Sequence, residues 1–445
     1  MKQSHYLDFL RFSLHEQAEV PECVRVINWL SLLQFAKQQS IQGIYWMGVR
    51  RLGELKENKP TDDDVMKWMA ACGKLVNRNN HVTEKSAWVA KNFQSEGFQS
   101  CLLKGQGNAL FYPDPTLRYP GDIDIWVSPT PTLPSREGES SPTPNSSPVG
   151  RGTKVSPTGG DIEGASSAAS QRSKGYLPRS FVHHASVTAL LRSMTCGSNG
   201  SRRSSFHFSL FTNREDEDIR TVIAYCRQFV PDAKACYHHI DFLNAGDVPV
   251  EVHYRPSWLN NPFNNRRLQQ YFFEHADAQF ANQQPQGFAV PTWDFNRVFL
   301  LSHIANHLLH EGIGLRQVVD YYYLLKSNPD RDSIDDYEKE FKRLGLLPFA
   351  RQLMWVLCQV LGLEEQLLVA RQDERRGRLL LNEMMAGGNL GKHDERFLSG
   401  SYSSAFKSNL QRLVRDLRMM RYFPSECLWE PPFRIWHYFW RRKHS

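Results

Sequence analysis

The sequence lacks paired cysteines. Its eight cysteines are scattered along the chain, and none forms a Cys-x-x-Cys pair or has a spacing typical of a zinc finger. A disulfide framework is therefore not expected, because such frameworks are typical of small secreted domains that are dense in cysteine. A reducing compartment, the cytoplasm, is the predicted location.

Long apolar runs are also missing. No stretch approaches the roughly eighteen consecutive apolar residues that a membrane-spanning helix needs, so no transmembrane segment is expected. Charged residues interrupt positions 1–20, where a secretion signal would need an apolar segment. The aromatic stretch 433–445 is too short and too charged to cross a bilayer. We expect a docked terminal helix there, the alternative being a helix that lies on a membrane surface.

The chain has little excess charge outside one segment. Its formal net charge is +7, and residues 129–206 hold +5 of it, since nine Lys or Arg residues there stand against four Asp or Glu residues. The rest of the chain is near neutral. Composition therefore gives no sign of the broad basic surface with which a protein binds long nucleic acid.

The same segment, 129–206, is rich in Ser, Thr, Pro and Gly and contains near-repeats. Such a composition cannot bury enough apolar surface to offset the conformational entropy of the chain, which predicts a disordered, low-complexity insert. Only residues 183–194 within it have helical periodicity. The remaining chain, from a total of 445 residues of which 41% are hydrophobic, is long enough for two or three domains with real cores.

Removal of the insert joins the two parts of one small α/β unit. A helix, a turn and a strand are predicted over 82–105, and a second strand over 121–128. A helix at 218–229 and two strands at 236–243 and 248–255 follow the insert. The fold class is therefore α+β, a small mixed sheet with helices. The predicted division is an amino-terminal helical region (1–84), the core's first part (85–128), the insert (129–206), the core's second part (207–285) and a carboxyl-terminal helical domain (286–445).

Both flanks have helical periodicity. In the amino-terminal flank the apolar spacing predicts helices over 23–39 and 63–80, the second opened by Thr61 and acidic residues. The carboxyl-terminal flank predicts a succession of helices with glycines at their ends. These helices cover residues 294–312, 315–327, 334–345 and 348–362.

Two aspartates interrupt an apolar strand. Positions two apart on a strand face the same side, so Asp122 and Asp124 point together while Ile123 and Ile125 point to the opposite layer. Two carboxylates so close repel one another unless a cation lies between them. Magnesium suits them because it prefers oxygen ligands and leaves positions for substrate phosphates. The alternative is a solvated face of an edge strand.

Features on either side of this strand favour the metal site. Upstream, Lys104 and Gly105 follow an apolar strand and precede a helix-like stretch, where backbone N–H groups hold anionic oxygen. Downstream, Glu251 is a charged residue on another apolar strand, and His253 shares its face. A phosphate cradle, two acids on one strand and a third on a neighbouring strand are the parts of a two-metal phosphoryl-transfer site.

Residues 102–127, together with 250–255, resemble the nucleotidyltransferase family proteins of bacteria, an uncharacterised branch of the DNA polymerase beta-like nucleotidyltransferase superfamily. The superfamily pattern has a Gly-containing turn at a helix start, an Asp-x-Asp on a strand and a third acid on a later strand. Residues 303–325 and 387–397 also look like this branch. One departure is Gln106, which follows Gly105 where the superfamily has Ser or Gly.

The resemblance implies a metal-dependent nucleotidyltransferase. Asp122, Asp124 and Glu251 would be its catalytic residues and would bind two magnesium ions, with manganese as the other possible metal. An acceptor hydroxyl of unknown identity would attack the α-phosphorus of a nucleoside triphosphate, with release of pyrophosphate. The residues implied in nucleotide binding are Lys104, Gly105, Gln106 and Arg118, and a solvated Arg118 is the alternative for the last.

Three histidines recur on one predicted helix face. His303, His307 and His310 are spaced i, i+4 and i+7. They could form a zinc site, a face of hydrogen-bonded histidines, or a surface that meets substrate; three ligands so spaced do not easily converge on one ion. Arg316 and Asp320 could simply pair with each other, and the resemblance instead implies that Arg316 lies near a nucleotide phosphate.

Two other functions stay open on the sequence alone. A nucleotide-binding or interaction protein could keep this fold with weak or no turnover, although the intact acid trio favours an enzyme. A zinc hydrolase centred on the helix of His303 is the other, and metal analysis would separate it from the first two.

Overall fold

A computed structural model describes residues 3–55, 60–129, 213–243, 245–330, 332–387 and 405–444. The predicted insert, apart from Pro129, and the helix predicted at 183–194 lie outside these residues, as does most of 387–397. The described residues all belong to one compact unit.

The centre of the fold is a four-stranded mixed sheet. Its strands are β1 (Phe98–Leu102), β2 (Ile123–Pro129), β3 (His239–Asp241) and β4 (Val250–His253), in the spatial order β1-β2-β4-β3. β2 pairs antiparallel with β1 and parallel with β4, and β3 pairs antiparallel with β4. The predicted α+β class, with its small mixed sheet assembled across the insert, is confirmed.

The register of β2 and β4 gives the sheet one apolar face and a second face that carries Asp124 and Glu251, here called the functional face. Ile123 and Ile125 lie opposite Val250 and Val252, and all four are buried. The intervening positions point to the other face, since side chains alternate along a strand. Trp126 lies on that other face and packs against Phe280, with the two ring centroids 4.7 Å apart.

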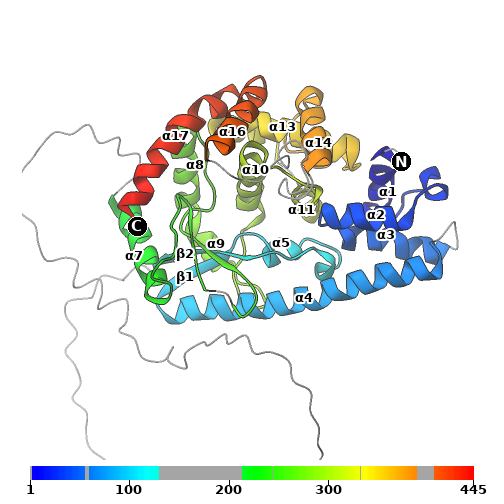
Figure 1. The fold of residues 1–445 in the computed structure, drawn as a ribbon, viewed down its shortest axis with the longest axis horizontal. Coiled ribbons are helices and arrows are strands. Elements are labelled where there is room, and N and C mark those ends of the chain that lie inside the picture. Colours follow the sequence, from blue (N-terminus) through cyan, green and yellow to red (C-terminus); the bar gives the residue numbers. More distant parts are fainter. Residues whose placement is uncertain are drawn as a thin grey trace, which may run out of the picture. The chain divides into compact units, whose positions relative to one another are not determined.

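A long helix supports the sheet. α4 (Asp62–Ser95) packs against β1 and β2 and against the single-turn helix α5 (Gln106–Ala109), as Figure 1 shows, and α7 (Asn213–Phe229) packs against β2. Thr61 caps α4 as predicted, its hydroxyl oxygen accepting a hydrogen bond from the Asp64 N–H. α4 runs unbroken through residues 84 and 85, where the predicted first boundary falls; the five-part division stays a prediction.

The amino-terminal helices pack on the start of α4. They are α1 (Gln3–Leu14), the 3₁₀ turn η1 (Glu22–Arg25), α2 (Trp29–Gln38) and α3 (Gln42–Leu55). The helix predicted over 23–39 is thus an α-helix only from Trp29 onward. Phe9, Trp29 and Tyr45 are buried together, with stacked and edge-on rings. These rings are part of a hydrophobic core that also includes Phe299 and Tyr322 of the carboxyl-terminal flank.

The carboxyl-terminal flank is a succession of helices, as predicted. Glycines with positive φ, Gly312, Gly345 and Gly362, follow α10 (Trp293–His310), α12 (Ile334–Arg343) and the segment after α13 (Leu347–Trp355). They confirm the predicted helix ends. The segment after α13 is a π-helical turn, η3 (Val356–Val360). The other elements are η2 (Pro115–Leu117), α8 (Pro262–Glu274), α9 (Ala276–Ala281), α10 (Trp293–His310), α11 (Leu315–Ser327), α12 (Ile334–Arg343), α13 (Leu347–Trp355), η4 (Glu365–Leu367), α14 (Glu374–Gly387), α16 (Ala405–Met420) and α17 (Pro424–Lys443).

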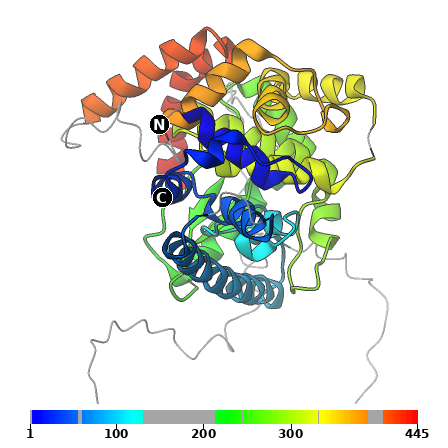
Figure 2. The same ribbon diagram turned by 90° about the vertical axis from the view of Figure 1, so that its right-hand side faces the viewer.

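The aromatic end of the chain is a docked helix. α17 packs on α16, and Figure 2 shows the two, orange-red and red, next to each other. The Tyr237 ring meets the rings of Phe433, Trp436 and Trp440 on α17 edge-on. Among the described residues, none of the helices has the length and apolar character that a membrane crossing requires.

Candidate functional site

A cavity of about 610 Å³ lies on the functional face of the sheet, and helices α10, α11, α16 and α17 contribute to its wall. Every residue that the sequence predicts for the site lines it, except Gln106. These lining residues are Lys104, Gly105, Arg118, Asp122, Asp124, Glu251, His253, His303, His307 and Arg316.

The three predicted acids meet on the cavity wall. Asp124 on β2 lies directly opposite Glu251 on the parallel strand β4, and Asp122 immediately precedes β2. One carboxylate oxygen from each lies within 4.8 Å of the others. The negative charge of Asp124, and then burial, raise the pKa of Asp122. The trio therefore concentrates negative charge that a cation would relieve.

Lys104 supplies part of the positive charge that offsets the carboxylates of the trio. Its Nζ lies 2.7 Å from Oδ1 of Asp124, and its side chain is 18% exposed. Burial alone would lower the pKa of Lys104, but the charges of Asp124, Asp122 and Glu251 outweigh it and raise the pKa. Burial would likewise raise the pKa of Asp124, yet Lys104 and His253 hold it below its usual value. Both groups are therefore charged at neutral pH.

His253 lies between the carboxylates of Asp124 on β2 and Glu251 on β4. Its Nε2 lies 3.1 Å from Oδ1 of Asp124 and 3.5 Å from Oε2 of Glu251. The imidazole is buried, which would lower its pKa, but the hydrogen bonds to the two acids more than compensate and raise the pKa. His253 therefore fixes the orientation of Asp124 and Glu251.

A strained turn places Gly105 beside the acids. Gly105 has φ 57° and ψ −116°, and a Cβ there would lie 3.4 Å from the backbone oxygen of Asp122. Gly107 lies so close to the end of β1 that a Cβ would approach the Leu102 carbonyl oxygen to 2.9 Å. The helix-like stretch predicted after this turn is only the four residues of α5. The glycines thus let the turn pass close under the acid trio.

Gln106 points away from the cavity. Its side-chain amide donates hydrogen bonds to the Asn79 carbonyl oxygen and to the Thr83 hydroxyl on α4. The side chain is buried there, and a buried amide needs such hydrogen-bond partners in place of water. The structure thus gives Gln106 a structural contact with α4, and it does not place its side chain where it was predicted to bind nucleotide.

Arg118 is neither solvated nor free. Its Nε and Nη2 lie 2.8 and 2.7 Å from the two carboxylate oxygens of Asp320, and both side chains are buried. Tyr112 donates a further hydrogen bond to Asp320 at 2.6 Å. Burial would raise the pKa of Asp320, and Arg118 lowers it instead. This pair fastens the segment before β2 to α11 from inside the cavity wall.

Arg316 lies in the cavity without the predicted partner. Asp320 pairs with Arg118, and the buried Nε of Arg316 has no hydrogen-bond partner among the described residues. Burial, and then the charge of Arg118, lower its pKa from the ordinary value. One of its terminal nitrogens approaches Gly121, next to Asp122. Arg316 is therefore a cation that faces the trio's side of the cavity.

The three histidines of α10 line the cavity without forming a metal cluster. His303 Nε2 lies 2.9 Å from His307 Nε2, whose other nitrogen lies 3.0 Å from Glu311. Burial, and then Lys104, hold the pKa of His303 well below its ordinary value, and burial lowers the pKa of His310 to about 4. Within the part of the chain described here, no metal-binding group of donors includes them. They form a hydrogen-bonded face on the cavity.

Other lining residues were not predicted. Cys236, His238 and His239 border the cavity beside Glu251, and their Cys-x-His-His spacing was a signal available in the sequence. Arg415, Arg434 and His437 reach the cavity from α16 and α17. No local pattern connects these distant helices with the sheet, so only the tertiary structure could place them.

Comparison with known proteins supports the assignment of the chain. A family model described as an uncharacterised nucleotidyltransferase matches residues 25–134 and 207–362, together more than half of the chain, and the break between them falls at the predicted insert. No curated protein and no solved structure matches the chain. The matched regions contain the acid trio, Lys104, Gly105 and helices α10 and α11 of the cavity wall, whereas α16 and α17 lie outside them. The chain therefore belongs to this uncharacterised nucleotidyltransferase family.

Proposed function

We propose that this protein moves a nucleoside monophosphate from a nucleoside triphosphate to an acceptor hydroxyl, with release of pyrophosphate. The observation that carries the proposal is the acid trio, with oxygens within 4.8 Å of one another on the wall of a cavity of about 610 Å³. Cytoplasmic location remains part of the proposal. The acceptor class is open.

The trio fits a divalent cation such as Mg²⁺. All three donors are carboxylate oxygens, which hard cations prefer, and the raised pKa of Asp122 shows how closely the charges crowd. Lys104 and His253 both approach Oδ1 of Asp124, so we assign its Oδ2 to the cation. Two such ions would neutralise phosphate charge and lower the pKa of the attacking hydroxyl.

The chain's own residues would hold the triphosphate. Lys104, at the trio, and Arg316, next to Gly121, bring positive charge to one end of the cavity. Gly105 lets the backbone approach the phosphates closely, because no side chain stands in front of its N–H. Arg118 would act as a positioning residue, because its guanidinium is held by Asp320. Gln106 has no part in this proposal.

The reaction would form a bond from the acceptor oxygen to the α-phosphorus and break the bond from that phosphorus to the pyrophosphate oxygen. The hydroxyl proton would pass to Glu251, whose side chain is 30% exposed at the cavity. Lys104 and Arg316 would stabilise the charge that develops on the leaving pyrophosphate. His253 would keep Asp124 and Glu251 oriented throughout.

Purified full-length protein with Mg²⁺ tests this proposal. Each α-labelled nucleoside triphosphate is incubated with acceptor fractions from a lysate, and label transfer and pyrophosphate are measured. We expect both to be lost in the Asp122→Asn, Asp124→Asn double variant and kept in Asp247→Asn, which changes an exposed aspartate bound to Arg78. Equal transfer in the double variant and the wild type would refute the assignment.

The alternative of a nucleotide-binding protein without turnover gives a different result in the same assay. Equilibrium binding of the triphosphate would then be measurable, and pyrophosphate release would stay at the level of the double variant under every acceptor condition. The acid trio and its charged surroundings favour turnover, because crowded ionisable groups with shifted pKa values in a cavity are typical of catalytic sites.

A further inference from the structure

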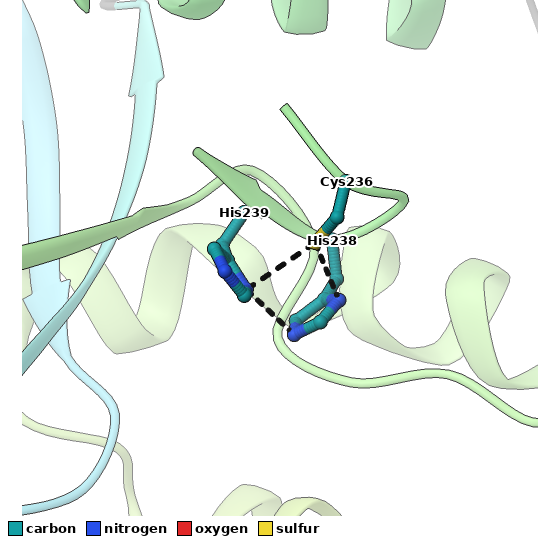
Figure 3. Close-up of side chains that lie close together, drawn as sticks. All are labelled: Cys236, His238 and His239. Carbon is teal, nitrogen blue, oxygen red and sulfur yellow. Dashed lines mark hydrogen bonds between the residues drawn. The ribbon is translucent and has the colours of Figure 1, made fainter. Parts of the chain in front are cut away.

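A second cluster of donors lies next to the acid trio on the same cavity wall. Cys236 and His238 stand in the turn before β3, and His239 begins that strand. Figure 3 shows both imidazole rings turned toward the Cys236 sulfur. His239 also connects the two groups, since its Nδ1 lies 3.8 Å from Oε2 of Glu251.

The spacing of the donor atoms suits one tetrahedral transition-metal ion. The Cys236 Sγ lies 3.3 Å from Nδ1 of His238 and 3.4 Å from Nδ1 of His239. Typical zinc–sulfur and zinc–nitrogen bond lengths place such ligands about 3.5 Å apart in a tetrahedral site. His238 can offer only one nitrogen to the ion, and its other nitrogen, Nε2, lies 2.8 Å from Nδ1 of His239. One donor atom from each of the three residues lies within 4.8 Å of the others, so rotation of the rings would bring the donors to ligand spacing.

Hydrogen bonds alone do not satisfy all the close contacts within this cluster. Nδ1 of His239 contacts both the Cys236 sulfur and Nε2 of His238 and carries at most one proton. One cation bound by the Cys236 sulfur, Nδ1 of His239 and a single nitrogen of His238 would accept a lone pair from each at the same time. The thiol would release its proton to solvent when it binds the ion, as thiolate ligands do.

The backbone holds the cluster in place. The Cys236 N–H donates to the His239 carbonyl oxygen at 2.9 Å and closes the turn, and the Tyr254 N–H donates to the His238 carbonyl oxygen at 3.0 Å. The His238 ring lies on Trp258 with ring centroids 4.1 Å apart. Donors held this firmly lose little conformational entropy when an ion binds.

A carboxylate lies near the second nitrogen of His239, at ion-pair distance and beyond hydrogen-bond length. Its other nitrogen, Nε2, lies 3.7 Å from a carboxylate oxygen of Asp241. A carboxylate near the second nitrogen of a ligating histidine is the usual arrangement in zinc proteins, because it fixes the ring and strengthens the metal bond. Such an arrangement is not needed for a surface histidine.

We infer that Cys236, His238 and His239 form a binding site for Zn²⁺, distinct from the carboxylate site for the cation of nucleotidyl transfer. One thiolate and two imidazoles are soft to intermediate ligands, which favour zinc over magnesium. Among the residues that the structure describes, this group has three donors, so a fourth position opens to a water or a substrate oxygen in the cavity, as in catalytic zinc sites. The inference does not depend on the proposed function.

Cobalt substitution tests the site directly. The full-length protein, freed of metal with a chelator, is titrated with Co²⁺ and followed by absorption. We expect one equivalent to give tetrahedral d–d bands and a thiolate-to-cobalt charge-transfer band, which Zn²⁺ bleaches and excess Mg²⁺ leaves unchanged. Cys236→Ser should abolish the charge-transfer band. Its absence in the wild type, or its persistence in Cys236→Ser, would overturn the inference.

Matched variants separate the site from folding and from the acid trio. Cys358→Ser changes another partly exposed cysteine, in η3, and should keep the band. His238→Ala gives a second loss that does not touch the thiol, and Asp241→Asn should weaken Co²⁺ binding about tenfold or more. The Asp122→Asn, Asp124→Asn variant should keep the full band; its loss there would place the ion at the trio and refute a distinct site.

The open coordination position has its own readout. Azide added to the cobalt protein should shift the d–d bands, because it replaces the non-protein ligand. Unchanged bands at saturating azide would mean four protein ligands and would contradict an open position. Thermal unfolding of each variant accompanies every titration, so that a lost band is read only from a folded protein.

Discussion

Asp124 and Glu251 lie directly opposite each other on the parallel strands β2 and β4, and Nε2 of His253 contacts both carboxylates. These acids are separated in the sequence by the whole insert. Parallel pairing with this register is what brings them to the same face, since a shift by one residue would turn Glu251 to the apolar layer. The catalytic proposal depends on this register.

Glu251→Gln should therefore reduce nucleotidyl transfer with little effect on folding. The amide keeps the shape of the side chain but loses the negative charge and the proton acceptor, which predicts a fall in the rate of about 10²- to 10⁴-fold. Pyrophosphate release measures it, and triphosphate binding is followed in parallel. A rate within threefold of the wild type would exclude Glu251 from the reaction. Glu274→Gln, on the exposed end of α8, is the control.

Lys104→Met should increase the electrostatic repulsion among the three carboxylates. The variant leaves the buried Asp124 with His253 in place of two partners, which is expected to lower the free energy of unfolding by up to about 3–5 kcal/mol. Millimolar Mg²⁺ should restore more stability to the variant than to the wild type, because the ion replaces the lost charge. Thermal melts with and without Mg²⁺ measure this difference. Equal Mg²⁺ shifts in both proteins would contradict the cation site; Lys67→Met, in an exposed ion pair, should change little.

The sequence predicted the helices and strands of this fold better than the contacts between them. Period-two alternation located β2 and β4, and the glycines at 312, 345 and 362 marked helix ends, because these signals depend on local backbone geometry. The continuity of α4 was missed, because packing on the sheet and on the amino-terminal helices stabilises a 34-residue helix whose segments look separate in sequence.

Site residues were predictable where they belonged to one motif. Asp122, Asp124 and Glu251 followed from strand alternation and from the family resemblance. The partner of Arg118 was not predictable, because Asp320 lies 202 residues away and could equally have paired with Arg316 in its own helix. Gln106 shares the motif's turn but faces α4, because a side chain's direction at a strained turn depends on the tertiary contacts.

Asp320→Ala should destabilise the protein through Arg118. Removal of one member of a buried, bidentate pair leaves an uncompensated charge, and the expected loss is about 3–5 kcal/mol of unfolding free energy. Because the pKa of Asp320 is lowered in the folded state, the wild type loses this contribution as the pH falls. The variant's deficit should therefore shrink in acid. Chemical denaturation at pH 7 and pH 3 measures it, and a deficit independent of pH would contradict the ion pair's role.

Gly105→Ala should impair the turn beside the trio. A residue with φ 57° and ψ −116° lies in a region that L-residues rarely adopt, which costs about 1–3 kcal/mol, and the new Cβ would stand 3.4 Å from the Asp122 carbonyl oxygen. We expect weaker triphosphate binding together with this loss of stability. Gly53→Ala is a matched control in α3, where a Cβ meets nothing within 4 Å and alanine should be neutral or stabilising. Equal effects of the two substitutions would show that the turn at Gly105 has no special conformation.

Asp416 should make the stability of the α16–α17 pair depend on pH. Burial, and then the charge of Glu430, raise its pKa from 3.8 to about 6. Between these values the folded state holds a proton that the unfolded chain has released, so this group's contribution to stability falls as the pH rises through that window and stays low above it. Asp416→Asn should match the wild type near pH 4 and be about 1 kcal/mol more stable at pH 8. Urea denaturation at both pH values checks this, with Asp232→Asn, an exposed turn residue, as control. A difference of the same size at both pH values would show that Asp416 does not titrate in this window.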